Sequence, residues 1–297
     1  MKQQIKFYGK YYWVFYYLNN AFLLLLAVVC ILPMVNVLAV SFSAAHYAAA
    51  GRVGFWPVGF TTASYKIALS DAKFWNSLRI SLIRTIGGTA INVVLTTLAA
   101  YPLSKDTKYF PSRDRYMMFV FITMVFGGGL VPGFLVVYYT GLYNTIWSLI
   151  IPGAVSGWNV VLMLNFFRQL PKEIEEAAII DGAGHMRILT QIIVPVSKAS
   201  IATITLFCLV GHWNDWFGGM LYMSTSSRYP LATYLQSLLS VDVARYMPKA
   251  EREIMALLNT KTLKAALVFI NAAPIIAVYP FLQKHFTKGL VLGSVKG

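Results

Sequence analysis

Apolar residues gather in six runs along this chain, and stretches richer in polar residues separate the runs. The runs cover about 18–40, 78–100, 116–139, 145–167, 201–223 and 263–286. A helix needs roughly 20 mostly apolar residues to cross the hydrocarbon core of a bilayer. Because each run reaches about that length, the pattern predicts an all-α, polytopic membrane protein with six transmembrane helices.

Basic residues in the short loops predict the orientation of these helices. Short loops that carry Lys and Arg tend to stay on the cytoplasmic side of the membrane. An even number of spans places both termini on the same side. The basic residues expected on that side are Lys2, Lys6, Lys10, Lys105, Lys108, Arg113, Arg115, Arg168, Lys172, Arg187, Lys198, Lys284, Lys288 and Lys296. We therefore expect both termini and the stretch 170–198 to be cytoplasmic.

The composition favours a membrane protein over other classes. Hydrophobic residues make up 58% of the chain and charged residues 12%, whereas about a quarter of a soluble domain is charged. A net charge of +14 could indicate nucleic-acid binding. The basic residues lie between the apolar runs, however, so membrane lipid is the expected partner and nucleic acid is not. The first run lacks a small-residue cleavage site, which favours a retained anchor over a signal peptide.

A long polar interruption, 171–195, lies between the fourth and fifth runs. Pro171 can occupy the first turn of a helix, and Glu173 and Glu175 follow where negative charge suits a helix start. The breaker Asp-Gly-Ala-Gly at 181–184 separates this helix from a second one, which we expect to end at Pro195. We call 171–195 the knuckle. Two short helices outside the bilayer need a surface to dock on, and we expect that surface to belong to another protein.

Three elements of the knuckle carry a family resemblance: Glu176-Ala177-Ala178, Asp181-Gly182-Ala183 and Ile193-Val194-Pro195. Their order and spacing resemble the EAA motif of bacterial ABC importer permeases, and the Asp-Gly-Ala form is typical of carbohydrate permeases. Val194 departs mildly, because the family often has Leu there. Further resemblances occur at 74–78, 99–104, 144–152, 213–214 and 288–297. The chain looks like the second permease of an oligosaccharide or polysaccharide importer of the lipoprotein-linked subgroup.

The resemblance implies the type I ABC importer permease fold in the bacterial cell membrane. It divides the chain into a cytoplasmic segment 1–17, a first transmembrane helix with an extracellular loop 18–72, a core 73–286 with a cytoplasmic coupling loop 170–198, and a cytoplasmic tail 287–297. The implied partners are a second homologous permease, two cytoplasmic ATPase subunits, an extracellular solute-binding protein and a sugar substrate. Transport would proceed by alternating access.

The resemblance also implies that the knuckle couples transport to ATP hydrolysis. The residues expected to contact an ATPase subunit are Glu176, Ala177, Ala178, Asp181, Gly182, Gly184 and Pro195. Small alanines allow close approach, Gly182 or Gly184 can supply the bend, and the two acids can bond to basic groups. Glu173 and Glu175 are interpreted as simple helix-start charges.

The sequence contains no G-x-x-x-x-G-K-[ST] loop for nucleotide phosphates. We therefore expect no cofactor on this chain and no enzymatic activity of its own, with ATP and Mg²⁺ bound by the partner ATPase. The histidines show no metal-ligand spacing, so no metal site is expected.

Polar and aromatic residues within the second and fifth runs are candidates for a substrate path: Arg84, Trp213, Asn214, Asp215 and Trp216. Sugars bind through stacking on aromatic faces and through hydrogen bonds from such side chains. The alternatives are that the tryptophans belong to an interfacial belt and that Arg84 pairs with a carboxylate. Gly127–Gly129 in the third run can provide close packing, which we favour, or a hinge. The loop 224–261 either meets the binding protein or is an ordinary extracellular loop.

Two other functions stay open at this point. The same importer type can serve a non-sugar solute such as a peptide or a polyol. A secondary transporter would carry paired ionisable groups at mid-membrane, for which a single Asp215 is thin support. A membrane-embedded enzyme would need a catalytic cluster, and the sequence contains none.

Overall fold

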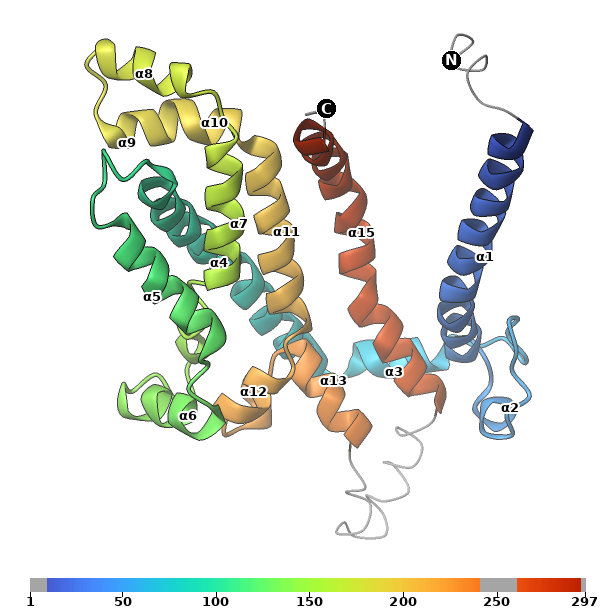
Figure 1. The fold of residues 1–297 in the computed structure, drawn as a ribbon. Coiled ribbons are helices and arrows are strands. Elements are labelled where there is room, and N and C mark those ends of the chain that lie inside the picture. The colour runs from blue at the N-terminus through green and yellow to red at the C-terminus, as the bar shows by residue number, and fades with distance from the viewer. Residues whose placement is uncertain (1–9, 241–260, 295–297) are drawn as a thin grey trace. The chain divides into compact units, whose positions relative to one another are not determined.

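The computed structural model of the protein describes residues 10–240 and 261–294, and these residues form helices and connecting loops without any strand. The helices are labelled in Figure 1, and the chain divides into two compact units. One unit comprises 1–71 and 241–270, and the other comprises 72–240 and 271–297. The all-α prediction is confirmed. Part of the long loop 224–261 and the ends of both termini lie outside the described residues.

The first unit begins with α1 (Lys10–Ser41), followed by the short helices α2 (Ala45–Ala49) and α3 (Ala63–Ser70). Pro33 lies inside α1, so the first apolar run continues past it as predicted. The hydroxyls of Ser41 and Tyr65 lie 2.8 Å apart, and the ring of Phe42 stacks on Tyr65. These contacts fold the segment 42–71 back onto the end of α1.

The second unit contains the remaining long helices. Its elements are α4 (Ala72–Ser104), α5 (Arg113–Val125), α6 (Leu130–Tyr139), η2 (Ile146–Leu149), α7 (Gly157–Arg168), α8 (Lys172–Ile180), α9 (His185–Ile188), η3 (Leu189–Ile193), α10 (Val194–Val196), α11 (Lys198–Asn214), α12 (Phe217–Tyr222), η4 (Ser226–Arg228) and α13 (Leu231–Ser240). The helix α15 (Lys261–Ser294) starts in the first unit and ends in the second.

The described residues contain three helices long and apolar enough to cross a membrane, 12–41, 72–104 and 261–278. Two bent helix pairs bring the number to five if each pair is one span. The predicted fourth span is divided instead between η2 and α7, which has 12 residues. Pro152 and Gly153 lie in the gap between them. The count of six spans therefore stays a prediction, although most of the predicted apolar runs form helices.

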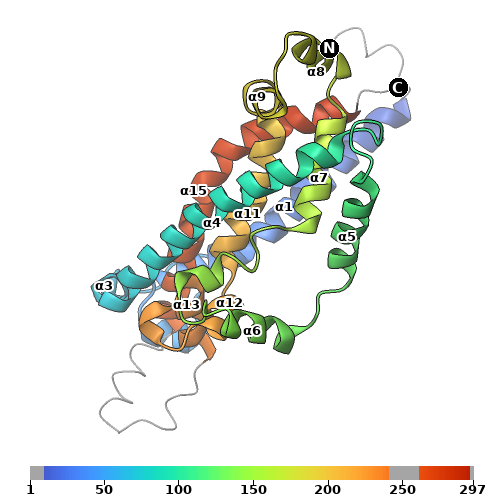
Figure 2. The same cartoon turned by 90° about the vertical axis from the view of Figure 1, so that its left-hand side faces the viewer.

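The third predicted span is sharply bent. The pair α5 and α6 meets at an angle of 113° (Figure 2). Gly128 and Gly129 have φ values of +69° and +93°, which only glycine adopts readily. A Cβ at Gly127 or Gly128 would meet nothing within 4 Å. The favoured interpretation of this glycine run as a close-packing surface is therefore wrong for this chain, because the run breaks the helix.

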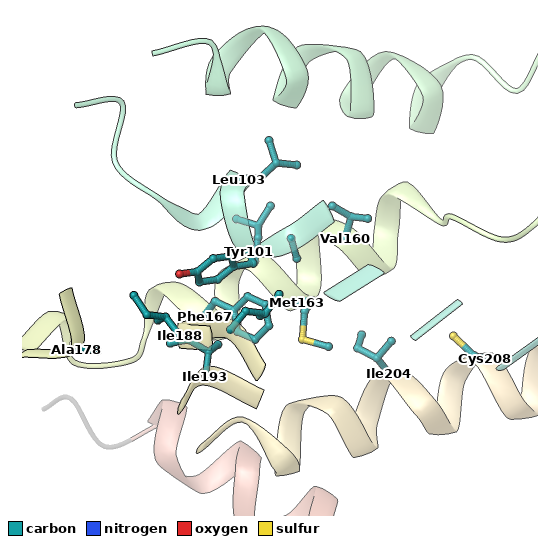
Figure 3. Packing of buried hydrophobic residues seen from close by; sticks show 13 residues of the cluster. Tyr101, Leu103, Val160, Met163, Phe167, Ala178, Ile188, Ile193, Ile204 and Cys208 are labelled. Atoms are coloured by element: carbon teal, nitrogen blue, oxygen red, sulfur yellow. The ribbon is translucent and has the colours of Figure 1, made fainter. Parts of the chain in front are cut away.

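One buried apolar cluster joins the knuckle to the long helices of the second unit (Figure 3). It contains Ala100, Tyr101 and Leu103 of α4, Val160, Met163, Leu164 and Phe167 of α7, Ala178, Ile188, Leu189 and Ile193 of the knuckle, and Ile204 and Cys208 of α11. Burial of such side chains is the main source of stability in water. Here it makes the knuckle part of the core of this unit.

The contact between α12 and α13 yields a prediction for stability. A Cβ on Gly219 would overlap Thr233 Oγ1 and lie 2.9 Å from Pro230 Cδ, and Thr233 is fully buried. Overpacking of this kind costs about 1–3 kcal/mol, so Gly219→Ala should lower the melting temperature of the purified protein in detergent. Gly133→Ala is the control, because its Cβ would meet nothing within 4 Å. Equal melting temperatures for both variants would contradict the packing described here.

Candidate functional site

The knuckle is a helix–turn–helix whose bend depends on one glycine. The helix α8 begins at Lys172, so Pro171 is the N-cap rather than a residue of the first turn. Gly182 has a φ of +76°, and Ala183 N donates to Ala178 O at 2.9 Å. A left-handed glycine closing a helix in this way is a common C-terminal cap. Gly184 has a φ of −74°, so the bend belongs to Gly182 alone.

The second part of the knuckle extends further than predicted. The helix α9 continues through the π-helical stretch η3 into α10, which contains Pro195 and reaches Val196. The expectation that Pro195 ends this helix is wrong. A proline inside a helix removes one i→i−4 hydrogen bond, and Pro195 follows the π-helical stretch η3, where the α-helical bonding pattern is already interrupted. The chain then bends by 85° between α10 and α11.

The exposed side of the knuckle carries apolar side chains among charged ones. Ile180 is 85% exposed, and Ile179 and Met186 are also exposed. The candidates Glu176, Ala177, Asp181, Gly182, Gly184 and Pro195 lie on the surface as well. Exposed apolar patches on a structured segment mark interaction sites. Ile179, Ile180 and Met186 were missed from sequence, although the pair Ile179-Ile180 next to the EAA motif was a signal for them.

Ala178 differs from the other coupling candidates because it faces inward. It is 7% exposed and packs in the cluster with α4 and α7 (Figure 3). Its small side chain therefore allows α8 to approach the core of its own chain. Ala178 therefore does not lie on the surface that was expected to contact an ATPase subunit. Ala177 is exposed and can still make that contact.

Glu175 connects the knuckle to the end of α4. Its carboxylate accepts a hydrogen bond from the hydroxyl of Tyr101 at 3.0 Å and forms an ion pair with Lys105. Lys105 Nζ also lies 3.9 Å from the centre of the Tyr101 ring. Burial lowers the pKa of Lys105, and the hydrogen bond and charge of Glu175 offset part of this effect. The interpretation of Glu175 as a simple helix-start charge is therefore wrong, whereas Glu173 is exposed at the helix start.

A second, more exposed ion pair lies beside the first. Lys172 Nζ is 2.7 Å from Asp106 Oδ2. The hydrogen bond from Lys172 holds the pKa of the Asp106 carboxyl below its usual range. Exposed pairs of this kind contribute little to stability. We therefore assign the attachment of α8 to α4 mainly to Glu175 and the apolar cluster.

A cavity of about 310 Å³ lies within the second unit. Its polar lining residues are Arg84, Asn92, Ser148, Asn159, His212 and Asp215, and Phe207 and Tyr222 contribute aromatic rings. The size is at the lower end of the range of about 300–1,000 Å³ for small-molecule sites. The cavity can therefore accommodate a small polar ligand.

Arg84 and Asp215 form an ion pair in this cavity, although 131 positions separate them in sequence. Arg84 is 3% exposed, and its Nη1 also donates to the backbone oxygen of Asp215 at 2.8 Å. Asp215 caps the end of α11, and its Oδ1 accepts from Gly218 N at 3.0 Å. The structure thus selects the alternative in which Arg84 pairs with a carboxylate, and both residues also line the cavity.

The other three substrate-path candidates do not line the cavity. Trp213 is buried, and its Nε1 donates to Asn271 O at 2.9 Å. Asn214 and Trp216 are exposed, and neither is a lining residue. Sequence analysis missed Asn92, Asn159 and His212 instead. Asn92 and Asn159 lie inside apolar runs, where polar side chains usually mark a functional or packing role, and this was the available signal.

The chain resembles proteins of polysaccharide transport in sequence and in structure. It is 36% identical over 276 residues to the polygalacturonan/rhamnogalacturonan transport system permease protein YtcP of Bacillus subtilis, covering 93% of this chain and 96% of that protein. It is 38% identical to the protein LplC of Bacillus subtilis, covering 96% of this chain and 95% of that protein. A crystal structure of a bacterial ABC transporter involved in the import of the acidic polysaccharide alginate matches with a TM-score of 0.84 and 29% identity, over 94% of this chain and 99% of that one.

The family model of the binding-protein-dependent transport system inner membrane component matches residues 92–291. This range includes the C-terminal part of α4 from residue 92, the whole knuckle, α11 and most of α15. The match extends over about two thirds of the chain and agrees with the resemblance carried by the EAA motif. The chain therefore belongs to the family of binding-protein-dependent transport system inner membrane components, and it is a multi-pass membrane permease.

Proposed function

We propose that this protein is a membrane-spanning permease subunit of an ATP-driven importer for an oligosaccharide or polysaccharide. Its membership in a binding-protein-dependent family supports transport. Relatives named for polygalacturonan/rhamnogalacturonan transport and for alginate import support a sugar substrate. Both termini and the knuckle lie in the cytoplasm, as the basic residues of the short loops indicate.

The observation that carries the proposal is the two-faced geometry of the knuckle. Its inner side is fixed to the long helices through Ala178 and Glu175. Its outer side exposes Ile179, Ile180 and Met186. A surface that is packed against its own chain on one side and exposes apolar side chains on the other suits docking with another protein. We assign that face to a cytoplasmic ATPase subunit.

The partner subunits follow from this assignment. ATP and Mg²⁺ bind to two ATPase subunits, because the sequence of this chain lacks a nucleotide phosphate loop. A second homologous permease completes the translocation path, and an extracellular solute-binding protein delivers the sugar. The permease itself carries out no covalent chemistry.

Alternating access can be driven through two connections of the knuckle. Motion of the ATPase dimer displaces α8, and Glu175 transfers the displacement to α4 through Lys105 and Tyr101. The backbone transfers it to α11 directly, through α10. Arg84 lies on α4 and Asp215 directly follows α11, so movement at the knuckle reaches the cavity. Energetic coupling through packed helices with two arrangements is the physical basis of such a mechanism.

Reconstitution of the complete importer in vesicles tests the proposed function. Oligosaccharides prepared from polygalacturonan, alginate and maltodextrin are offered outside, together with a peptide and a polyol as competing solutes. We expect ATP-dependent accumulation of an oligosaccharide that stops when the binding protein is omitted. If only the peptide or the polyol accumulated, the proposed sugar substrate would be wrong and that solute would take its place. Uptake driven by an ion gradient without ATP would contradict the importer assignment.

A further inference from the structure

The stretch 52–60, which we call the aromatic loop, folds back beside the C-terminal end of α1 (Figure 1). Hydrogen bonds hold it there at both ends. The side-chain amide of Asn36, on α1, donates to Gly54 O at 2.7 Å. Further along the loop, Val58 N donates to Ser43 Oγ at 3.0 Å. The aromatic loop therefore has a fixed position along α1, between the level of Asn36 and the end of the helix.

The aromatic loop exposes large side chains from this fixed position. Trp56 is 81% exposed, Phe60 is 70% exposed and Phe55 is 52% exposed. Arg52, at the start of the loop, is exposed as well. Exposed aromatic side chains that gather on one fixed segment mark an interaction surface. The attachment to α1 limits what can cover that surface, because α1 is long and apolar enough to cross a membrane.

The distance along α1 indicates that the bilayer surface covers the loop. The N-terminal end of α1 exposes Tyr12, Trp13, Tyr16 and Tyr17, a grouping typical of an aromatic belt at one membrane–water interface. Asn36 follows Tyr17 by 19 residues, which corresponds to about 28 Å of helix. The hydrocarbon core is about 30 Å thick. With the four aromatic residues at one interface, Asn36 and the loop bonded to it lie at the other.

The helix α1 has no aromatic belt of its own at this second interface. Its residues 34–41 include no aromatic residue, and the aromatic loop supplies Trp56 and two phenylalanines at the same level. Tryptophan suits the interface because its ring is apolar while its N–H can bond to a headgroup. The guanidinium of Arg52 can pair with a lipid phosphate. A lipid surface therefore matches both the depth and the chemistry of the loop.

We propose that the aromatic loop is an anchor that lies in the lipid headgroup region at the C-terminal end of α1, with Trp56 as its main contact. Asn36 is the residue that positions the loop at this depth. The anchor binds lipid and not the transported solute, so it goes beyond the proposed function. With aromatic belts at both of its ends, α1 is held at one depth in the bilayer.

Spin labels on single cysteines test the anchor in the assembled importer in vesicles, in a Cys30→Ser/Cys208→Ser background. The label is placed at position 56, at Ser226 as an exposed control outside the long helices, and at Val29 as an exposed control in the middle of α1. Relaxation by oxygen, which concentrates in hydrocarbon, is compared with relaxation by a water-soluble nickel chelate. We expect the nickel-to-oxygen ratio at position 56 to be at least about twofold below that at 226 and above that at 29, as for a headgroup depth. Asn36→Leu should raise the ratio at position 56 toward the value at 226.

Three results would overturn the anchor. The first is a ratio at position 56 as high as that at 226, which would place the side chain in water. The second is a weak response to both reagents, which would place it against another protein chain. The third is a change at position 56 on addition of the solute-binding protein, which would assign the loop to that protein. A label at Phe55 gives the same readout if position 56 labels poorly. ATP-driven uptake in the same vesicles is scored separately, so failure of the anchor leaves the importer assignment untouched.

Discussion

Replacing Gly182 with valine is expected to lower ATP-driven sugar uptake by at least about tenfold. Gly182 has a φ of +76°, a conformation that costs a β-branched residue about 1–3 kcal/mol. A Cβ at this position would meet nothing within 4 Å, so the cost is entirely one of backbone conformation. Relief of the strain would turn α9 relative to α8 and disrupt the apolar docking face. Uptake and ATP hydrolysis by the reconstituted importer are the measurements.

Two controls separate the bend from a general effect of side-chain size. Gly182→Asn should keep at least about half of the uptake, because asparagine tolerates the left-handed region. Gly184→Ala should also keep it, since Gly184 has a φ of −74° and open space around it. Normal coupling in the valine variant would show that the bend is not needed. An equal loss in all three variants would instead indicate that the knuckle tolerates no side chain at either glycine.

Replacing Glu175 with glutamine is expected to uncouple ATP hydrolysis from uptake. The substitution removes the charge that pairs with Lys105 and weakens the bond to Tyr101. Hydrogen bonds to charged groups contribute about 1.5–3 kcal/mol, and each 1.4 kcal/mol corresponds to about tenfold in an equilibrium constant. We therefore expect uptake per ATP hydrolysed to fall about tenfold. The ratio of the two rates in vesicles is the measurement.

Glu173→Gln provides the matched control for this prediction. Glu173 lies in the same first turn of α8 and is exposed, so its variant should couple normally. Lys105→Met should reproduce the defect of Glu175→Gln, and the double variant should add little, because both remove one interaction. Full coupling in Glu175→Gln, or additive losses in the double variant, would exclude a role for this ion pair in transmission.

Local sequence patterns predicted the parts of the fold that depend on local chemistry. The apolar runs predicted the long helices α1, α4, α11 and α15. The Asp-Gly-Ala-Gly breaker predicted the turn of the knuckle, although sequence alone did not distinguish Gly182 from Gly184. Glycine is needed only where φ is positive, and that depends on how the two helices leave the turn.

Contacts between distant residues could not be predicted in the same way. Lys105 and Glu175 are 70 positions apart, and Arg84 and Asp215 are 131 positions apart. No local pattern links such pairs, so Glu175 was interpreted as a helix-start charge and the partner of Arg84 stayed open. The rotation of α11 about its axis determines which of its side chains face the cavity. Trp213 was expected to line the substrate path, but it packs away from the cavity. Composition alone does not determine that rotation.

Site-specific photo-crosslinking from Ile180 tests the central claim that the knuckle docks on an ATPase subunit. Ile180 is 85% exposed, so a photoreactive side chain there leaves the core intact. Tyr139 at the end of α6 is 79% exposed and serves as the control. We predict that illumination of the assembled importer crosslinks position 180, and not position 139, to the ATPase subunit. Absence of that product at position 180 in an importer that hydrolyses ATP would contradict the account.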